Sequence, residues 1–282
     1  MQMAKAKKIL FITQEMTPYV PESAMTKLGR ELPHSIQEKK REIRTFMPKW
    51  GIINERRNQL HEVIRLSGMN LIIDDTDHPL IIKVASIASA RMQVYFIDND
   101  DYFSHRKTAC DENGKEYTDN AERAVFYARG VLETVKKLRW TPEIIHCQGW
   151  ISSILPLYIK TAYQEEPSFR DCRVVYTPSE EGLHEPMPSN FGDILKFRTA
   201  GADAIEDIKG SMDTQLLNRL GMKYADGVSL VKPEASFETF ASERGIPCLA
   251  AQKPEDFGTA YSAFYDEIWS EGKPEEEEEE EF

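Results

Sequence analysis

The chain has 282 residues, of which 41% are hydrophobic and 10% aromatic, and its formal net charge is −12. This size allows one large core without staples, and the acidic balance disfavours nucleic acid and membrane surfaces as partners. Four widely spaced cysteines without a CxxC pair, and the lack of a signal peptide or of an apolar run of about 20 residues, indicate free thiols, no metal site and a cytoplasmic location.

Short β-rich runs alternate with helical patterns along most of the chain. Such alternation implies crossover connections, and so predicts an α/β fold with a Rossmann-like, mostly parallel sheet flanked by helices. The first run, residues 9–13, is apolar at nearly every position, which is typical of a strand covered on both faces at the sheet centre. The predicted strands are residues 9–13, 43–47, 69–73, 80–87, 92–97, 143–147, 172–177 and 227–231.

One segment departs from this alternation. Between residues 63 and 97 the extended runs have no long helix between them, so antiparallel hairpins are expected there. The clearest helix follows, because Asp119 as N-cap and Glu122 three residues later predict a capping box before a run with helical apolar spacing. A second helix is predicted over residues 150–163.

The C-terminal region combines a docking helix with a charged tail. Phe257, Tyr261, Phe264 and Ile268 recur at helical spacing and predict a helix that packs one face on the body. Seven net negative charges lie in residues 275–281, which leaves about −5 for the rest. We therefore expect a single domain over residues 1–270 and a disordered acidic tail over residues 271–282.

Six stretches of the sequence resemble the glycogen and starch synthases, in the order that this family has them between residues 7 and 238. They read KKILFITQEMTPY, IRTFMPKWG, VYFIDNDDYF, DENGKEYTDNAERAVFYARGVLE, TPEIIHCQGWISSILPLYIKT and KYADGVSLVKPEASFE. The resemblance implies a bacterial-type retaining glucosyltransferase with the GT-B fold, of which this chain corresponds to the N-terminal lobe with a C-terminal helix packed back on it. No cofactor is implied, because ADP-glucose or UDP-glucose would be the substrate.

The family's phosphate loop is rewritten here. Where family members carry K-T-G-G-L, this chain has Pro21, Glu22, Ser23 and Ala24. Proline removes an N–H donor, glutamate brings charge of the wrong sign, and side chains replace the bare glycine backbone that approaches a diphosphate. The loop is therefore expected to be degenerate as a donor-phosphate site.

The family's H-x-H-D-W-H stretch also differs, because only His146 and Trp150 remain and Gln148 stands at the second histidine. His146 is either a catalytic group or a core histidine bonded to backbone. Gln148 has the chemistry to bond a sugar hydroxyl. After the next strand, Thr177 is kept but is followed by Pro178 in place of the family's polar cleft residues.

The resemblance marks the remaining substrate-binding candidates. Besides His146, Gln148, Trp150 and Thr177, these are Glu15, Tyr117, Asp119, Asn120 and Arg123. Carboxylates and carboxamides are suited to hold the hydroxyls of a sugar or acceptor. A helix cap with a surface salt bridge explains Asp119, Asn120 and Arg123 equally well, so both interpretations stay open here.

Three functions follow from these patterns. The first is a glycogen-synthase-like protein of storage-glucan metabolism. It would act as an α-glucan-binding or regulatory partner, with little or no transferase activity alone. The second is a glucosyltransferase that works with a second glycosyltransferase chain, because retaining transfer needs both lobes around the bond that breaks. The third is an unrelated Rossmann-like binding module. Whether the chain is an enzyme is not decided by the sequence.

Overall fold

The computed structural model describes residues 5–73, 75–179, 183–208 and 214–271. The strands are β1 (Lys8–Thr13), β2 (Glu42–Pro48), β3 (His61–Glu62), β4 (Met69–Ile73), β5 (Thr76–Ile87), β6 (Met92–Asp98), β7 (Ile144–Gln148), β8 (Arg173–Thr177), β9 (Gly227–Ser229) and β10 (Cys248–Leu249). The helices are α1 (Ala24–Glu38), α2 (Asn120–Leu138), α3 (Ile154–Lys160), α4 (Phe191–Ile194), α5 (Thr214–Lys223), α6 (Ala235–Glu243) and α7 (Phe257–Glu271). Single helical turns are η1 (Ala88–Ala90), η2 (Asp100–Ser104), η3 (Trp150–Ser152), η4 (Ala202–Ile205) and η5 (Pro254–Asp256).

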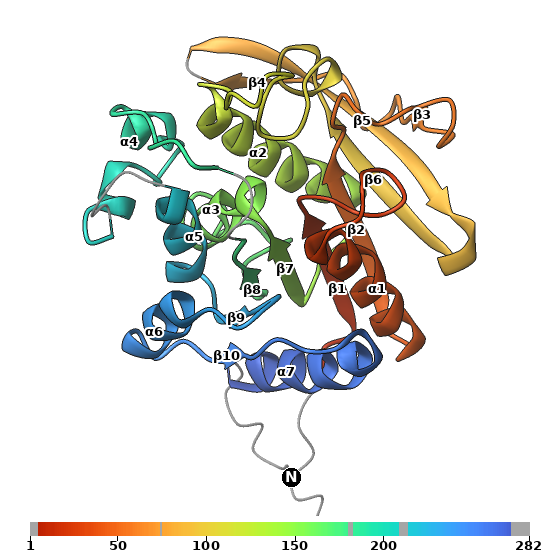
Figure 1. Cartoon of the computed structure of the whole chain (residues 1–282), viewed down its shortest axis with the longest axis vertical. Coiled ribbons are helices and arrows are strands. Elements are labelled where there is room, and N and C mark those ends of the chain that lie inside the picture. Colours follow the sequence, from red (N-terminus) through yellow and green to blue (C-terminus); the bar gives the residue numbers. More distant parts are fainter. Residues whose placement is uncertain (1–4, 74, 180–182, 209–213, 272–282) are drawn as a thin grey trace, which may run out of the picture.

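A mixed sheet forms the centre of the molecule (Figure 1). Its strand order is β10-β9-β8-β7-β1-β2-β6-β5-β3, and β4 pairs with β5. Neighbouring strands from β10 to β6 run parallel, whereas β3, β4 and β6 are antiparallel to β5. The predicted α/β fold with a mostly parallel sheet is confirmed, and so are the antiparallel hairpins predicted between residues 63 and 97.

β1 lies between β2 and β7, as its apolar sequence predicts. Ile9 and Phe11 are buried in a cluster with α1 and α7, while Leu10 and Ile12 belong to the larger cluster on the opposite face. Because successive side chains of a strand point to opposite faces, one five-residue run anchors both layers of helices.

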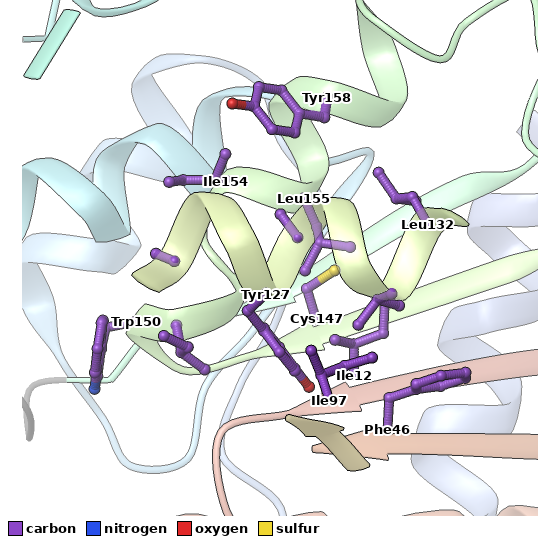
Figure 2. Close-up of a cluster of buried hydrophobic side chains, with 14 of the residues drawn as sticks. Ile12, Phe46, Ile97, Tyr127, Leu132, Cys147, Trp150, Ile154, Leu155 and Tyr158 are labelled. Carbon is purple, nitrogen blue, oxygen red and sulfur yellow. The ribbon is translucent and has the colours of Figure 1, made fainter. Parts of the chain in front are cut away.

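The opposite face is filled from α2 and α3 (Figure 2). There Cys147 of β7 lies among side chains that include Tyr127 and Leu132 of α2 and Leu155 of α3 (Figure 2). The Tyr127 hydroxyl donates to the carbonyl oxygen of Thr13 at 3.1 Å, so its buried polar atom is satisfied. All four cysteines are free, and burial raises the pKa of the Cys147 thiol.

α2 starts where predicted, but the predicted capping box is absent. Asp119 makes no cap hydrogen bond, because both of its carboxylate oxygens accept from Arg106 Nη1 at 2.6 Å. Glu122 accepts from the hydroxyl of Tyr102 at 3.3 Å. The carboxylates of Asp119 and Glu122 thus bond side chains of the segment that precedes α2, and not the backbone N–H groups at the start of the helix.

The helix predicted over residues 150–163 is shorter than expected and is split in two. It forms the single turn η3 and then α3, which ends at Lys160. The hydroxyl of Ser152 donates to the carbonyl oxygen of Gly149 at 2.9 Å, a side-chain bond to backbone of the kind that competes with regular helix.

The predicted C-terminal helix is confirmed as α7, which lies beside α1 below the sheet (Figure 1). Phe257, Tyr261, Phe264 and Ile268 are all buried, in the same cluster as Ile9 and Phe11 of β1. The chain reaches this helix from β10 through η5. The prediction that the acidic tail begins at residue 271 is wrong, because Glu271 is the last residue of α7. The rest of the predicted tail, residues 272–282, lies outside the described residues.

A buried ion pair fastens α7 to the body. Arg41 Nη1 and Nη2 each donate to one carboxylate oxygen of Asp266 at 2.8 Å, and the two side chains are 9% and 11% exposed. Asp266 also accepts from the backbone N–H of Ala6, and Arg41 also donates to the carbonyl oxygens of Ala6 and Ser262. Removing one member would leave the other as a buried, unpaired charge.

We expect Asp266→Ala to lower the free energy of unfolding by about 3 kcal/mol, because it strands the Arg41 guanidinium beneath α7. Asp171→Ala is the matched control, since Asp171 pairs with Arg170 on the surface, where both side chains are more than half exposed, and should cost less than about 0.5 kcal/mol. Urea denaturation followed by circular dichroism measures both values. An equal loss of free energy of unfolding in Asp266→Ala and Asp171→Ala would contradict the proposed role of the buried ion pair in fastening α7.

Candidate functional site

The loops that follow β1, β7, β8 and β9 meet at one edge, because these parallel strands end together at their carboxyl ends. A pocket of about 420 Å³ opens at this edge beside the first turn of α1. It is lined by Ala24, Met25, Pro178, Ser179, Leu230, Val231, Lys232, Glu234 and Phe237. The residues from Leu230 onward were not singled out from the sequence, although they lie in the last of the family-like stretches.

Residues 21–24, which are predicted to occupy the position of the family's phosphate loop, lead directly into α1 at this edge. Ser23 is the N-cap: its hydroxyl accepts from the N–H of Thr26 at 3.0 Å, and the Thr26 hydroxyl accepts from the N–H of Ser23 at 2.7 Å. The Ser23 hydroxyl donates to a carboxylate oxygen of Glu15 at 2.7 Å. The helix N-terminus therefore satisfies two of its N–H groups with its own side chains and carries an acid beside them.

The nearest cation on α1 is already neutralised. Lys27 Nζ lies 2.6 Å from a carboxylate oxygen of Glu22, and both side chains are at least half exposed. The hydrogen bond and the charge of Glu22 raise the pKa of Lys27. Lys27 thus points its charge at the loop glutamate, on the surface of the helix.

Gln148 ends β7 in a fully buried position between Thr13 of β1 and Thr177 of β8. Neither its amide nitrogen nor its amide oxygen has a hydrogen-bond partner within the described residues. A buried amide without partners costs about 1–3 kcal/mol. The end of this strand therefore holds an unused donor and acceptor at the ligand edge of the sheet.

Trp150 is positioned by the turn after Gln148. The backbone N–H of Trp150 donates to Gln14 Oε1 at 3.0 Å, and the centre of its indole ring lies 6.2 Å from that of Trp50. Gly149 has φ of +81°, and a Cβ there would come within 2.4 Å of Gln14 Oε1. Only glycine permits this turn, which brings Trp150 back beneath the edge.

His146 lies two residues deeper in β7 and has no exposed surface. Its Nδ1 pairs with the hydroxyl of Tyr265 and its Nε2 with the hydroxyl of Thr177, both at 2.7 Å, and Ser229 bonds Thr177 at 2.6 Å. The expectation of backbone partners is therefore wrong, because hydroxyls from β8 and α7 satisfy both ring nitrogens. Burial lowers the pKa of His146 to about 3, so the imidazole is neutral.

Asn120 and Arg123, two of the predicted substrate-binding candidates, hold the segment of residues 102–109 against α2. Arg123 is fully buried and donates to the carbonyl oxygens of Tyr102, Lys107 and Thr108, while Asn120 donates to that of Ala109. The surface salt bridge expected of Arg123 is wrong: the ion pair at this site joins Asp119 to Arg106.

Aromatic rings connect this cluster to the sheet edge. The Arg123 guanidinium lies 5.0 Å from the ring centre of Tyr117 and 5.2 Å from that of Trp50. Trp50 Nε1 donates to the carbonyl oxygen of Gln14 at 2.8 Å. Trp50 therefore lies between the Arg123 guanidinium and the ring of Trp150 and connects the two.

Two kinds of feature are missing from the described ranges. They contain no group of three or more His, Cys, Asp or Glu side chains arranged to hold a metal ion. In the same part of the chain, every helix is too short or too polar to traverse a bilayer.

Comparison with known proteins gives one consistent family. The starch synthase catalytic domain model matches residues 8–249. The glycogen synthase of Chlorobium limicola is 37% identical over 171 residues, which cover 60% of this chain and 35% of the relative. That of Chlorobium chlorochromatii is 31% identical over 254 residues, covering 89% of this chain and 49% of the relative. The chain thus spans half or less of the length of these relatives.

A solved structure agrees with the fold. The catalytic domain of Starch Synthase IV from Arabidopsis thaliana, bound to ADP and acarbose, superposes with a TM-score of 0.70 at 13% sequence identity. The match covers 89% of this chain and 52% of that chain.

The buried imidazole predicts a pH dependence of stability. An unfolded histidine titrates near pH 6.5, and the folded pKa of His146 is about 3. The unfolded state therefore binds the extra proton between these values, so the stabilisation is complete above about pH 6.5 and is lost as the pH falls. We expect the free energy of unfolding to fall between about pH 7 and pH 5, less steeply in His146→Asn.

His61→Asn serves as the control, because His61 is exposed on β3. Urea titrations at several pH values give the slope for each variant. A slope that is the same in wild type and His146→Asn would show that the imidazole is not held neutral.

Proposed function

We propose, from the premise that this chain belongs to the starch synthase catalytic domain family, that it serves storage-glucan metabolism by binding α-glucan or regulating its synthesis, with little or no glucosyl transfer alone. The observation that carries this proposal is the charge beside the N-terminus of α1, where Glu22 stands within the residues that occupy the family loop and Glu15 accepts from the N-cap Ser23.

These carboxylates oppose a diphosphate. Two like charges 4 Å apart near a protein surface repel by roughly 4 kcal/mol. Lys27 and Glu22 form an ion pair, so together they bring no net positive charge to a diphosphate. A neutral glucan carries no such penalty, so the altered edge discriminates against nucleotide sugars more than against sugars themselves.

Gln148 supports binding of an uncharged sugar. An amide offers both a donor and an acceptor, which are the two functions needed to pair with a hydroxyl group. Both atoms lack partners within the described residues. Gln148 thus adds an uncharged polar group to an edge whose pocket also contains Lys232 and Glu234.

A second function is a glucosyltransferase completed by another chain. It is favoured by the position of Lys232, which lines the pocket together with Ala24 and Met25 of α1 and brings a lysine from a different loop. The chain spans half or less of the length of the two glycogen synthase relatives. In this second function another polypeptide carries the other lobe. The third possibility, a likeness limited to the fold, is wrong because the family model matches residues 8–249.

Isothermal titration of the purified chain with maltoheptaose, ADP-glucose and UDP-glucose separates the two functions. We expect heat of binding with maltoheptaose and none with either nucleotide sugar, because only the latter meet Glu15 and Glu22 with negative charge. Tight binding of a nucleotide sugar would favour the two-chain transferase. The absence of any heat of binding with all three ligands would contradict both functions.

We expect Gln148→Met to separate binding from stability. Replacing an unpartnered buried amide by an apolar side chain of similar length should raise the free energy of unfolding by about 1 kcal/mol. The same change should weaken maltoheptaose binding about fivefold, by the loss of one or two hydrogen bonds. Gln164→Met is the control, because Gln164 is exposed after α3. A destabilised Gln148→Met with unchanged glucan affinity would give Gln148 a structural role only.

A further inference from the structure

The opposite, amino-terminal edge of the sheet contains a polar notch. β2 begins at Glu42 and β6 at Met92, but their pairing begins only at Thr45 and Val94. A pocket of about 540 Å³ occupies the space between these unpaired strand ends. It is lined by Gln37, Glu42, Ile43, Arg44, Arg91, Met92, Gln93 and Tyr95.

Arg44 lines this notch together with one acid, Glu42. Its guanidinium lies 5.1 Å from the ring centre of Trp140, and Nη1 donates to the Tyr95 hydroxyl at 3.1 Å. Nε is buried and has no hydrogen-bond partner, and Arg44 forms no ion pair with any described residue. A guanidinium held by aromatic groups with a donor unused is suited to an anion that enters from solvent.

Arg91 brings a second guanidinium from the turn between η1 and β6. Its backbone is left-handed, with φ of +50°, and its carbonyl oxygen accepts from Gln37 Nε2 at 3.3 Å. Its side chain is exposed and makes no ion pair within the described ranges. The αL turn and the bond from α1 hold Arg91 on the rim of the notch that Arg44 lines.

The acid in the notch is already engaged. Glu42 Oε1 accepts from Trp140 Nε1 at 2.6 Å, the same indole whose face meets Arg44. Two guanidinium groups therefore face one carboxylate that has its own donor. This local excess of positive charge lies on a chain whose net charge is −12, so an anion would be attracted to this notch while the surface as a whole repels it.

We propose that the notch lined by Arg44 and Arg91 binds a small oxyanion, either phosphate or the phosphate group of a monoester. Planar guanidinium groups match two oxygens of such a group, and the Nε donor of Arg44 is available for it. The site lies at the amino ends of the strands, so it is separate from the glucan edge at their carboxyl ends.

Isothermal titration in a phosphate-free buffer at low ionic strength tests the site with sodium phosphate, glucose 1-phosphate and glucose. We expect saturable binding of an anion by the wild type, and at least roughly tenfold weaker binding in Arg44→Gln and in Arg91→Asn. Asparagine tolerates the left-handed backbone at position 91, so this second variant decides the result if Arg44→Gln fails to fold. Circular dichroism checks the fold of each protein.

Arg56→Ala is the matched control, because it removes the same charge from an exposed loop. Equal affinity for phosphate and glucose 1-phosphate would identify the inorganic ion as the ligand, and tighter binding of the ester would identify a sugar phosphate. The proposal is overturned if neither anion binds, if glucose binds as well as glucose 1-phosphate, or if Arg56→Ala weakens binding as much as the notch variants do.

Discussion

The architecture depends on the need to cover β1 on both faces. A central strand whose buried residues are apolar except for Thr13 must lose water on both sides, and each face requires its own layer of helices. α2 and α3 cover one face of β1, and α1 and α7 together cover the other face. The last helix is therefore part of the core, although it is farthest from β1 in the sequence.

Polar groups inside this second layer make its packing specific. The bidentate pair of Arg41 and Asp266 and the bond between Tyr265 and His146 form together only when α7 sits in one register on the sheet. An apolar stripe alone would tolerate sliding of the helix. Buried polar groups penalise any position in which their partners are lost, which is why α7 has a fixed place.

Much of the fold could be predicted from the sequence, because alternation and periodicity are local signals. The eight expected strands, the hairpins and α7 were found in this way. The two-residue strands β3 and β10 carry no periodic signal and were missed. The contacts of Asp119 and Arg123 were misjudged because their partners belong to a separate segment, and tertiary bonds override the local preference for a helix cap. The partners of His146 are 31 and 119 residues away, so no local pattern could indicate them.

The two edges of the sheet differ in charge, and this difference links the two proposals. At the carboxyl edge, the first turn of α1 is capped by its own Ser23, and the acids Glu15 and Glu22 lie beside that turn. At the amino edge, Arg44 and Arg91 offer positive charge in a notch between splayed strands. In a scaffold of this family the anion would normally be drawn to the carboxyl ends of the strands. Here the local charges favour a neutral ligand at that edge and an anion at the other, so the two ligands would not compete for the same atoms.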